Sequence, residues 1–246
     1  MKIVGYSEGG IINALLYGIK YSATAESLLE DLLSRSRFPL IDGTAFHVSD
    51  AEVLIEQSFS GFGDADALLL INTGQSAISV FVEAKVKTFQ RAHWTIDDEF
   101  REFTSGTRTK VGSSNLFAQL YHKVRMVAGL RQGGIPALQV GIDFPKSSSR
   151  QIRKIGNNGV VLRAVEKLAE HLEKVYYLAI LPEQPANLEN FFKNELNWMA
   201  PADYSDWDVQ SYGYLAWSDV EAFCSENRLE NTLRVFKFNE GQIYGQ

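Results

Sequence analysis

The sequence predicts an α/β domain built on a mixed β-sheet. Amphipathic helices and short apolar strands follow one another in the order α, β, β, β, α, β, with additions after them. Short links join the first three strands, which favours antiparallel pairing among them. The chain has 246 residues, of which 45% are hydrophobic and 22% are charged. This composition excludes a disordered chain, and the length suits one large domain.

Two helices are expected near the N-terminus. Ser7 is placed to cap a helix over Glu8–Lys20, in which isoleucines and leucines recur at helical spacing. A second helix is expected over Thr24–Ser34, where leucines form the apolar stripe, and Pro39 marks the break after it.

Three strands are expected next, in close succession. Glu52–Ser60 alternates between polar and apolar residues, whereas Asp66–Asn72 and Ala77–Lys85 are mostly apolar. A glycine-rich turn at 61–63 and a polar turn at 72–75 separate these segments. We therefore expect the three strands to pair antiparallel.

The middle of the chain predicts both loops and regular elements. Residues 89–112 are polar and predict a loop with a short helical piece, and Lys146–Gly159 predicts a basic loop. Gly133, Gly134 and Pro136 are expected to end the helix before them. The other elements expected here are a helix from Ser113 or Ser114 to Leu130, a strand over Leu138–Ile142, a helix over Val160–Glu173 and a strand over Val175–Leu181.

Residues 183–246 are rich in Trp and Tyr and are expected to form an α+β extension that packs on the core of residues 1–182. Tyr212–Trp217 and Thr232–Phe238 predict strands. Ser218 and Glu221 have the spacing of a capping box, which predicts a helix from Ser218 to Asn227. We expect the extension to depend on the core for its folding.

Positive charge is concentrated in the middle of an acidic chain. The whole chain has 24 Lys and Arg against 30 Asp and Glu, a formal net charge of -6. Residues 85–154 alone contain 13 basic and 5 acidic residues. This basic block keeps nucleic acid open as a partner despite the acidic total, and a solvated positive face is the alternative.

The cysteine count and the apolar runs bear on location. Cys224 is the only cysteine, which excludes an internal disulfide and a multi-cysteine zinc site and agrees with a reducing, cytoplasmic location. No run approaches the roughly 18 apolar residues of a membrane span. The apolar stretch near Ile11–Ile19 lacks the basic flank of a signal peptide. We therefore expect no membrane partner.

Three charged side chains stand at the ends of two apolar strands. Asp66 opens one strand, and Glu83 and Lys85 close the next on a single face, because side chains alternate along a strand. In a hairpin of these strands, Asp66 approaches Glu83. Two converging carboxylates favour a hard cation such as Mg²⁺ or Mn²⁺, and a neighbouring lysine can activate a water or stabilise a phosphoryl oxygen. Together they are the apparatus of hydrolytic phosphodiester cleavage.

The segments Gly63-Asp64-Ala65-Asp66 and Phe81-Val82-Glu83-Ala84-Lys85 resemble the signature of the PD-(D/E)XK nuclease superfamily. Ala65 stands where the motif's name has Pro. The resemblance covers mainly residues 60–130 and the N-terminal helix. It implies a restriction-endonuclease-like core, with a mixed four-stranded sheet flanked by helices, and Mg²⁺-dependent cleavage of DNA or RNA. It also implies that Asp66 and Glu83 hold the metal while Lys85 assists the attacking water, with Asp64 as the alternative first acid.

Further site residues are implied by the same resemblance. Members of the superfamily often add a glutamate from the first helix, and Glu8 fits this catalytic and metal-binding role, with Glu26 and Glu30 as alternatives. Some members carry a Gln and a Tyr on the helix after the third strand, where this chain has Gln119 and Tyr121. Residues two apart do not share a helix face well, so Gln119 faces better with Lys123, four residues on.

Six basic residues are candidates for contacts to a phosphate backbone, and Trp94 is a candidate to stack on a base, with simple packing as the alternative. The six are Lys87, Lys123, Lys146, Arg150, Arg153 and Lys154. The expected function is a metal-dependent nuclease with DNA as the first substrate to test, and double-strand cleavage would favour a homodimer. A non-catalytic nucleic-acid-binding module and an unrelated α/β protein with an accidental motif are the alternatives.

Overall fold

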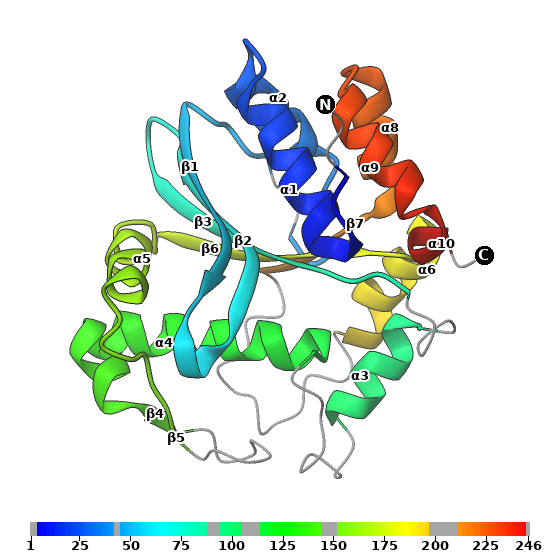
Figure 1. The fold of residues 1–246 in the computed structure, drawn as a ribbon. Helices are drawn as coiled ribbons and strands as arrows, with labels where there is room; N and C mark the ends of the chain where they lie inside the picture. Colours follow the sequence, from blue (N-terminus) through cyan, green and yellow to red (C-terminus); the bar gives the residue numbers. More distant parts are fainter. Residues whose placement is uncertain are drawn as a thin grey trace.

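The computed structural model describes residues 4–41, 45–87, 94–104, 114–143, 152–196 and 211–244. In this part of the chain the main sheet has five strands in the order β1-β2-β3-β6-β7. The sheet crosses the middle of the molecule between two layers of helices (Figure 1). The strands are β1 Asp50–Ser58, β2 Asp64–Asn72, β3 Ala77–Ala84, β6 Lys174–Leu181 and β7 Tyr212–Ala216.

The pairing makes the sheet mixed. β1, β2 and β3 pair antiparallel, as their short links predict, whereas β3 with β6 and β6 with β7 are parallel. The α/β class with a mixed sheet is therefore confirmed. β7 comes from the predicted C-terminal extension and makes the sheet five-stranded, one strand more than the resemblance implied.

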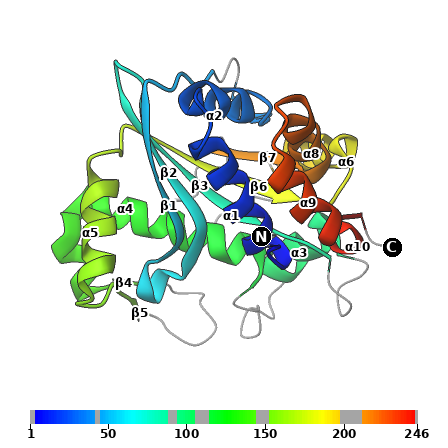
Figure 2. The same ribbon diagram turned by 45° about the horizontal axis from the view of Figure 1, so that its top comes forward.

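Helices cover both faces of the sheet, and the pleat sends alternate side chains to each layer. In β2, Leu69 and Ile71 belong to one core with α1, whereas Leu68 and Leu70 belong to the other with α4. Figure 2 shows α1 beside α9, with which it packs. The longest helices on the first face are α1 Ser7–Lys20, α2 Ala25–Ser34, α8 Trp217–Glu226 and α9 Glu230–Phe238, and the longest on the second are α4 Leu116–Val140 and α5 Gly159–Ala169.

Several shorter elements complete the described fold. The described part of the polar region 89–112, residues 94–104, contains the helix α3, and a 3-10 turn links β1 to β2. The predictions for residues 88–93, 105–113 and 144–151 lie outside the described residues. The shorter elements are η1 Ser60–Phe62, α3 Ile96–Thr104, β4 Ile142–Asp143, β5 Ile152–Arg153, α6 Pro185–Asn190, the π-helix η4 Phe191–Glu195 and α10 Glu240–Tyr244.

The prediction of a strand over Thr232–Phe238 is wrong, because this segment is helical and forms most of α9. Its β-branched and aromatic residues suggested a strand, but Thr232, Val235 and Phe236 are buried at the i, i+3, i+4 spacing of a helix. That stripe packs against α1, where the Thr232 hydroxyl donates to the Ala14 carbonyl at 2.9 Å. Helical packing against a neighbour outweighs strand propensity here.

The strand predicted over Leu138–Ile142 is also wrong in its main part. Helix α4 bends at Gly134, whose φ of 64° is left-handed, and continues through Pro136 to Val140. Two helical segments therefore meet at Gly134, whose φ of 64° and ψ of -163° are not helical, so the predicted end of the first segment at these residues is confirmed. A second helical segment follows it, and only Ile142–Asp143 is extended. Asn115, rather than Ser113 or Ser114, caps the helix by accepting from the Ala118 N–H at 3.1 Å.

Neither predicted serine cap is present. Ser7 is itself the first residue of α1, with φ of 62°, and its N–H donates to Asn239 Oδ1 at 2.8 Å. Ser218 lies one residue inside α8, which begins without a side-chain cap. Asn239 thus provides the hydrogen-bond acceptor for the first N–H of α1 that a local capping side chain usually provides.

Candidate active site

The antiparallel register brings Asp66 and Glu83 together. The β2–β3 ladder ends at the pair Ala67 and Val82, so Asp66 and Glu83 are the next residues, opposite each other. Asp66 Oδ2 accepts the N–H of Ala84 at 2.6 Å, which ties the carboxylate to the end of β3. The alternation of side chains places both residues on the face that α4 covers.

Glu83 is deeply buried beside a lysine ammonium. Its side chain is 1% exposed, and Oε1 lies 3.5 Å from Nζ of Lys123. Oε1 has no hydrogen-bond partner in the described part of the chain. Burial raises the pKa of Glu83 to about 7, Asp66 adds to the rise, and Lys123 and Lys85 oppose it. The two lysine charges therefore do not fully offset the cost of burying the Glu83 carboxylate.

Asp66 shares this electrostatic environment. Burial raises its pKa, the Ala84 hydrogen bond and the charges of Lys85 and Lys123 lower it, and the Glu8 charge raises it. Asp64, the alternative first acid, is exposed, and its carbonyl accepts from Lys123 Nζ at 2.8 Å. The structure thus brings Asp66, rather than the Asp64 carboxylate, to Glu83.

Lys85 lies two residues after Glu83 on the same face and contacts a side chain of α4. Its Nζ donates to Oε1 of Gln119 at 2.5 Å. Its backbone is fixed on both sides, because its N–H donates to Ile180 at 2.9 Å and its carbonyl accepts from Trp217 Nε1 at 2.7 Å. Gln119 therefore orients the lysine, whereas Tyr121 packs in the apolar core against Phe103.

Glu8 approaches the pair from the start of α1. It is half-buried, its Oε2 accepts from the Ser7 hydroxyl, and its charge acts on Asp66. The alternatives lie elsewhere: Glu26 is exposed, and Glu30 accepts from the Val48 N–H at 2.9 Å. Of the three glutamates, Glu8 is the one that the structure brings to Asp66.

Glu56 is an acidic neighbour that the sequence reasoning missed. It lies opposite Asp66 in the β1–β2 register and has a left-handed φ of 49°. Its Oε1 accepts from Asn13 Nδ2 at 2.9 Å, which draws the side chain toward α1. The strand pattern gave no signal for this turn of the backbone, because a positive φ is rare outside glycine.

The expectation that Lys123 contacts nucleic acid requires correction. Its side chain is 0% exposed, and its Nζ donates to the carbonyls of Phe62 and Asp64 at 3.1 Å and 2.8 Å. With Glu83 as its ion-pair partner, the ammonium is occupied inside the protein. Burial lowers the pKa of Lys123, and the Glu83 charge opposes that effect. Lys123 positions the turn before β2 and cannot reach a phosphate in this arrangement.

The other predicted basic residues lie around this centre or outside the described residues. Arg153 donates from Nη1 to the Gly61 carbonyl at 2.6 Å, and the Lys154 carbonyl accepts from Gly61 N–H at 3.0 Å, so β5 holds the same turn. The Lys154 side chain is exposed. Lys87 lines a separate cavity, whereas Lys146 and Arg150 fall outside the described residues.

Within the described ranges, no three His, Cys, Asp or Glu side chains form a group that could hold a metal ion. A site at this centre would rest on the two carboxylates of Asp66 and Glu83. Mg²⁺ is commonly held by one or two carboxylates, with water and substrate oxygens completing its coordination. The buried Glu83 Oε1, which has an ion pair but no hydrogen bond among the described residues, fits such a cation.

Comparisons with known proteins give no relative for this chain: no protein-family model, curated protein or solved structure matches it. A search of the helices in the described ranges finds none with the length and apolar character needed to cross a membrane.

Proposed function

We propose that this protein is a metal-dependent nuclease with a restriction-endonuclease-like core. The observation that carries the proposal is the meeting of Asp66 and Glu83 across β2 and β3, with Lys85 two residues further along the same face. Isolated in sequence, Glu-x-Lys is a weak signal. Its placement against a second carboxylate in the mixed sheet gives it chemical meaning.

Asp66 and Glu83 would hold Mg²⁺ or Mn²⁺, and Glu8, whose negative charge acts on Asp66, would add to the attraction for the cation. The bound metal would supply Lewis-acid stabilisation of a phosphoryl oxygen and a more acidic water. Glu83 favours this role because its carboxylate is buried and has an oxygen without a hydrogen bond. A cation would offset the cost of that buried charge.

Lys85 would act on the attacking water or on charge developing at the phosphate. Gln119 accepts a hydrogen bond from its ammonium, whose charge acts on both Asp66 and Glu83. Because Lys85 Nζ retains donors beyond this bond, it can contact a substrate oxygen as well. Asp66 and Glu83 would thus bind the metal, whereas Lys85 would transfer a proton or stabilise negative charge on the phosphate.

The test is cleavage of plasmid, single-stranded DNA and RNA with Mg²⁺ or Mn²⁺. We expect wild type to cleave at least one substrate, and chelator to abolish the cleavage. Lys85→Ala should reduce the rate by about 10²–10³-fold, the usual loss on removing a transition-state donor. The matched control is Lys237→Ala, which removes an exposed lysine from α9 and should leave the rate unchanged.

A second readout is independent of turnover. Binding of Mn²⁺, followed by electron paramagnetic resonance, should weaken in Glu83→Gln, because the amide loses the negative charge that holds the metal. Equal cleavage by wild type and Lys85→Ala would contradict the assigned role of Lys85. Nucleic-acid binding without cleavage or metal binding would instead support the non-catalytic module.

A further inference from the structure

A cavity of about 220 Å³ opens where three parallel strands end. Lys87 follows β3, Glu183 follows β6 and Trp217 follows β7, and all three line the cavity. Ligands of open α/β sheets bind outside the carboxyl ends of strands, because the loops there converge without blocking one another. The position is therefore suited to a ligand.

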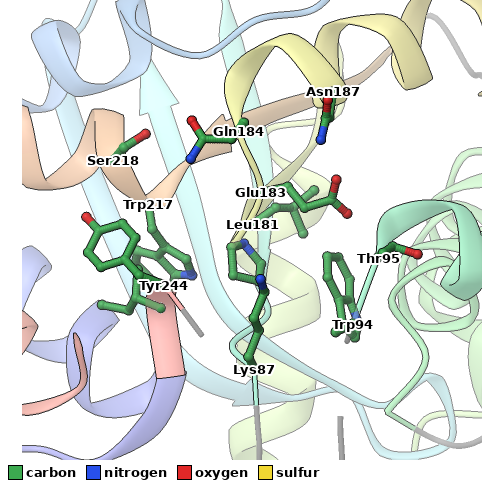
Figure 3. Close-up of a pocket in the computed structure, with 12 residues that line it drawn as sticks. Lys87, Trp94, Thr95, Leu181, Glu183, Gln184, Asn187, Trp217, Ser218 and Tyr244 are labelled. Carbon is green, nitrogen blue, oxygen red and sulfur yellow. The ribbon is translucent and has the colours of Figure 1, made fainter. Parts of the chain in front are cut away.

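The wall combines aromatic rings with an uncommitted ammonium. Figure 3 shows Lys87 extending between Trp217 on one side and Trp94 on the other. Lys87 forms no ion pair with any residue that the structure describes. The nearby Glu183 carboxylate interacts electrostatically with Lys87 without forming an ion pair, and its Oε1 accepts the Ile96 N–H at 2.5 Å, which secures the start of α3. An anion carried on a planar ring would match both the charge and the rings.

Trp94 contributes part of its ring to the wall of the cavity. The residue is 6% exposed, and its Nε1 is buried, so the surface that it offers to a ligand is that of ring carbons. The polar Gln184 and Asn187 also line the cavity and offer amide donors and acceptors of the kind that read base edges.

The cavity adjoins the candidate active site through covalent and hydrogen-bonded links. Lys87 is two residues beyond Lys85, and the Trp217 indole that lines the cavity donates to the Lys85 carbonyl at 2.7 Å. A strand whose scissile phosphate lay at Lys85 would therefore place a neighbouring nucleotide at this opening. The volume is below the roughly 300–1,000 Å³ of sites for drug-sized ligands, which suits one base rather than a base pair.

We infer that this cavity receives one unpaired nucleotide of the substrate strand, with its ring beside Trp94 and its phosphate on Lys87. The inference rests on the proposed nuclease function. A base within a duplex is stacked and paired, so it can enter only from a single strand, an end or a flipped-out position. The substrate class is therefore nucleic acid that is unpaired beside the cleavage site.

The test measures binding in chelator, so that no cleavage occurs. Fluorescence anisotropy compares a labelled single-stranded oligonucleotide with the blunt duplex of the same sequence. We expect the single strand to bind more tightly. Lys87→Gln and Trp94→Leu should each weaken single-strand binding by about tenfold, in the range of a lost stacking or phosphate contact. Lys237→Gln, a matched loss of charge on α9, should change it by less than about twofold.

Lys87→Gln carries the test if Trp94→Leu fails to fold, because Lys87 is half-buried and has no ion pair to lose. Equal binding by Lys87→Gln and Lys237→Gln, or equal binding of single strand and duplex, would overturn the inference. Competition by free dAMP at the same molar concentration as the oligonucleotide would also overturn it, since the cavity would then be a free-nucleotide site.

Cleavage with Mg²⁺, measured on the same proteins, separates this inference from the proposed function. If Lys87→Gln weakens binding but wild type does not cleave, the inference of a nucleotide-binding cavity stands and the proposed nuclease activity is contradicted. An active wild type whose Lys87→Gln variant binds and cleaves equally well would retain the nuclease and reject the cavity.

Discussion

At the scale of single residues, the buried pair of Lys123 and Glu83 organises the candidate site. Two charges removed from water are costly unless other groups satisfy them, and Lys123 has the Phe62 and Asp64 carbonyls in addition to Glu83. The sequence placed Gln119 and Lys123 on one face of α4. It could not reveal which of the lysines near the site is interior, because burial of a lysine depends on distant partners.

Removing the Lys123 charge should destabilise the protein strongly. Lys123→Met removes the ion-pair partner of Glu83 and the donor to two carbonyls, and we expect a loss of roughly 3–5 kcal/mol in the free energy of unfolding. Urea denaturation measures it. Lys154→Met, at an exposed lysine, should stay within about 0.5 kcal/mol of wild type. A similar small loss in both variants would contradict the structural role of Lys123.

The raised pKa of Glu83 predicts how stability depends on pH. Because the folded state keeps the proton up to about pH 7, against an ordinary pKa of 4.5, the contribution of Glu83 to metal-free stability falls as pH rises through this interval. Burial lowers the pKa of His122 to about 3 from 6.5, which gives the opposite slope below pH 6.5. The fall due to Glu83 is therefore cleanest just above pH 6.5.

Chemical denaturation at a series of pH values measures this dependence for wild type and Glu83→Gln. The variant should lack the fall, because an amide does not titrate. Added Mg²⁺ should stabilise wild type more at pH 8 than at pH 6, since the metal requires the carboxylate form. An identical pH profile in both proteins would show that Glu83 does not titrate in this interval.

At the scale of elements, the sequence predicts best where local pattern and tertiary packing agree. Strands β1, β2, β3, β6 and β7 and helices α1, α2 and α5 lie within a few residues of their predicted bounds, because their periodicity matches the faces that they bury. α9 was mistaken for a strand because its partner, α1, is distant in sequence. The caps failed for the same reason, since Asn239 supplies a contact that no local motif encodes.

The packing of α1 on α9 predicts an unusual effect at Gly18. Gly→Ala inside a helix ordinarily stabilises it by about 1 kcal/mol. At Gly18 the new Cβ would lie 2.8 Å from Thr232 Oγ1, so we expect Gly18→Ala to destabilise the protein instead, by about 1–3 kcal/mol. Thermal or urea unfolding measures the change.

Two comparisons isolate the cause. Gly241→Ala in α10 meets nothing within 4 Å and should be neutral or slightly stabilising. Combining Gly18→Ala with Thr232→Ala should recover part of the loss, because the hydroxyl that crowds the new methyl is gone. Strict additivity of the two substitutions would exclude the proposed contact.

At the scale of the whole molecule, one sheet joins the two predicted regions. β7 lies beside β6, all five of its residues are buried, and α8 and α9 complete the core around α1. The composition change near residue 182 indicated a boundary, whereas hydrogen bonding continues across it. The strand β7 was predicted, but a local pattern cannot reveal long-range parallel pairing. Its place beside β6 and the hydrogen bond from Trp217 to Lys85 are therefore known only from the fold.

A chain ending at residue 182 should therefore fail to fold as a unit. Removing β7 bares the edge of β6, and removing α8 and α9 exposes apolar side chains of α1. We expect loss of the cooperative thermal transition and rapid proteolysis, measured against the full chain. A sharp transition for residues 1–182 would show that the core is autonomous.

The bond between Asn239 and Ser7 also orders events during synthesis. The partners are 232 residues apart, so α1 leaves the ribosome long before the side chain that fixes its first turn. Glu8, which lies in that turn, gains its final place only after α9 has been made and docked. The arrival of Glu8 beside Asp66 is thus deferred until Asn239 has been synthesised, whereas Asp66 and Glu83 need only the β2–β3 hairpin to meet.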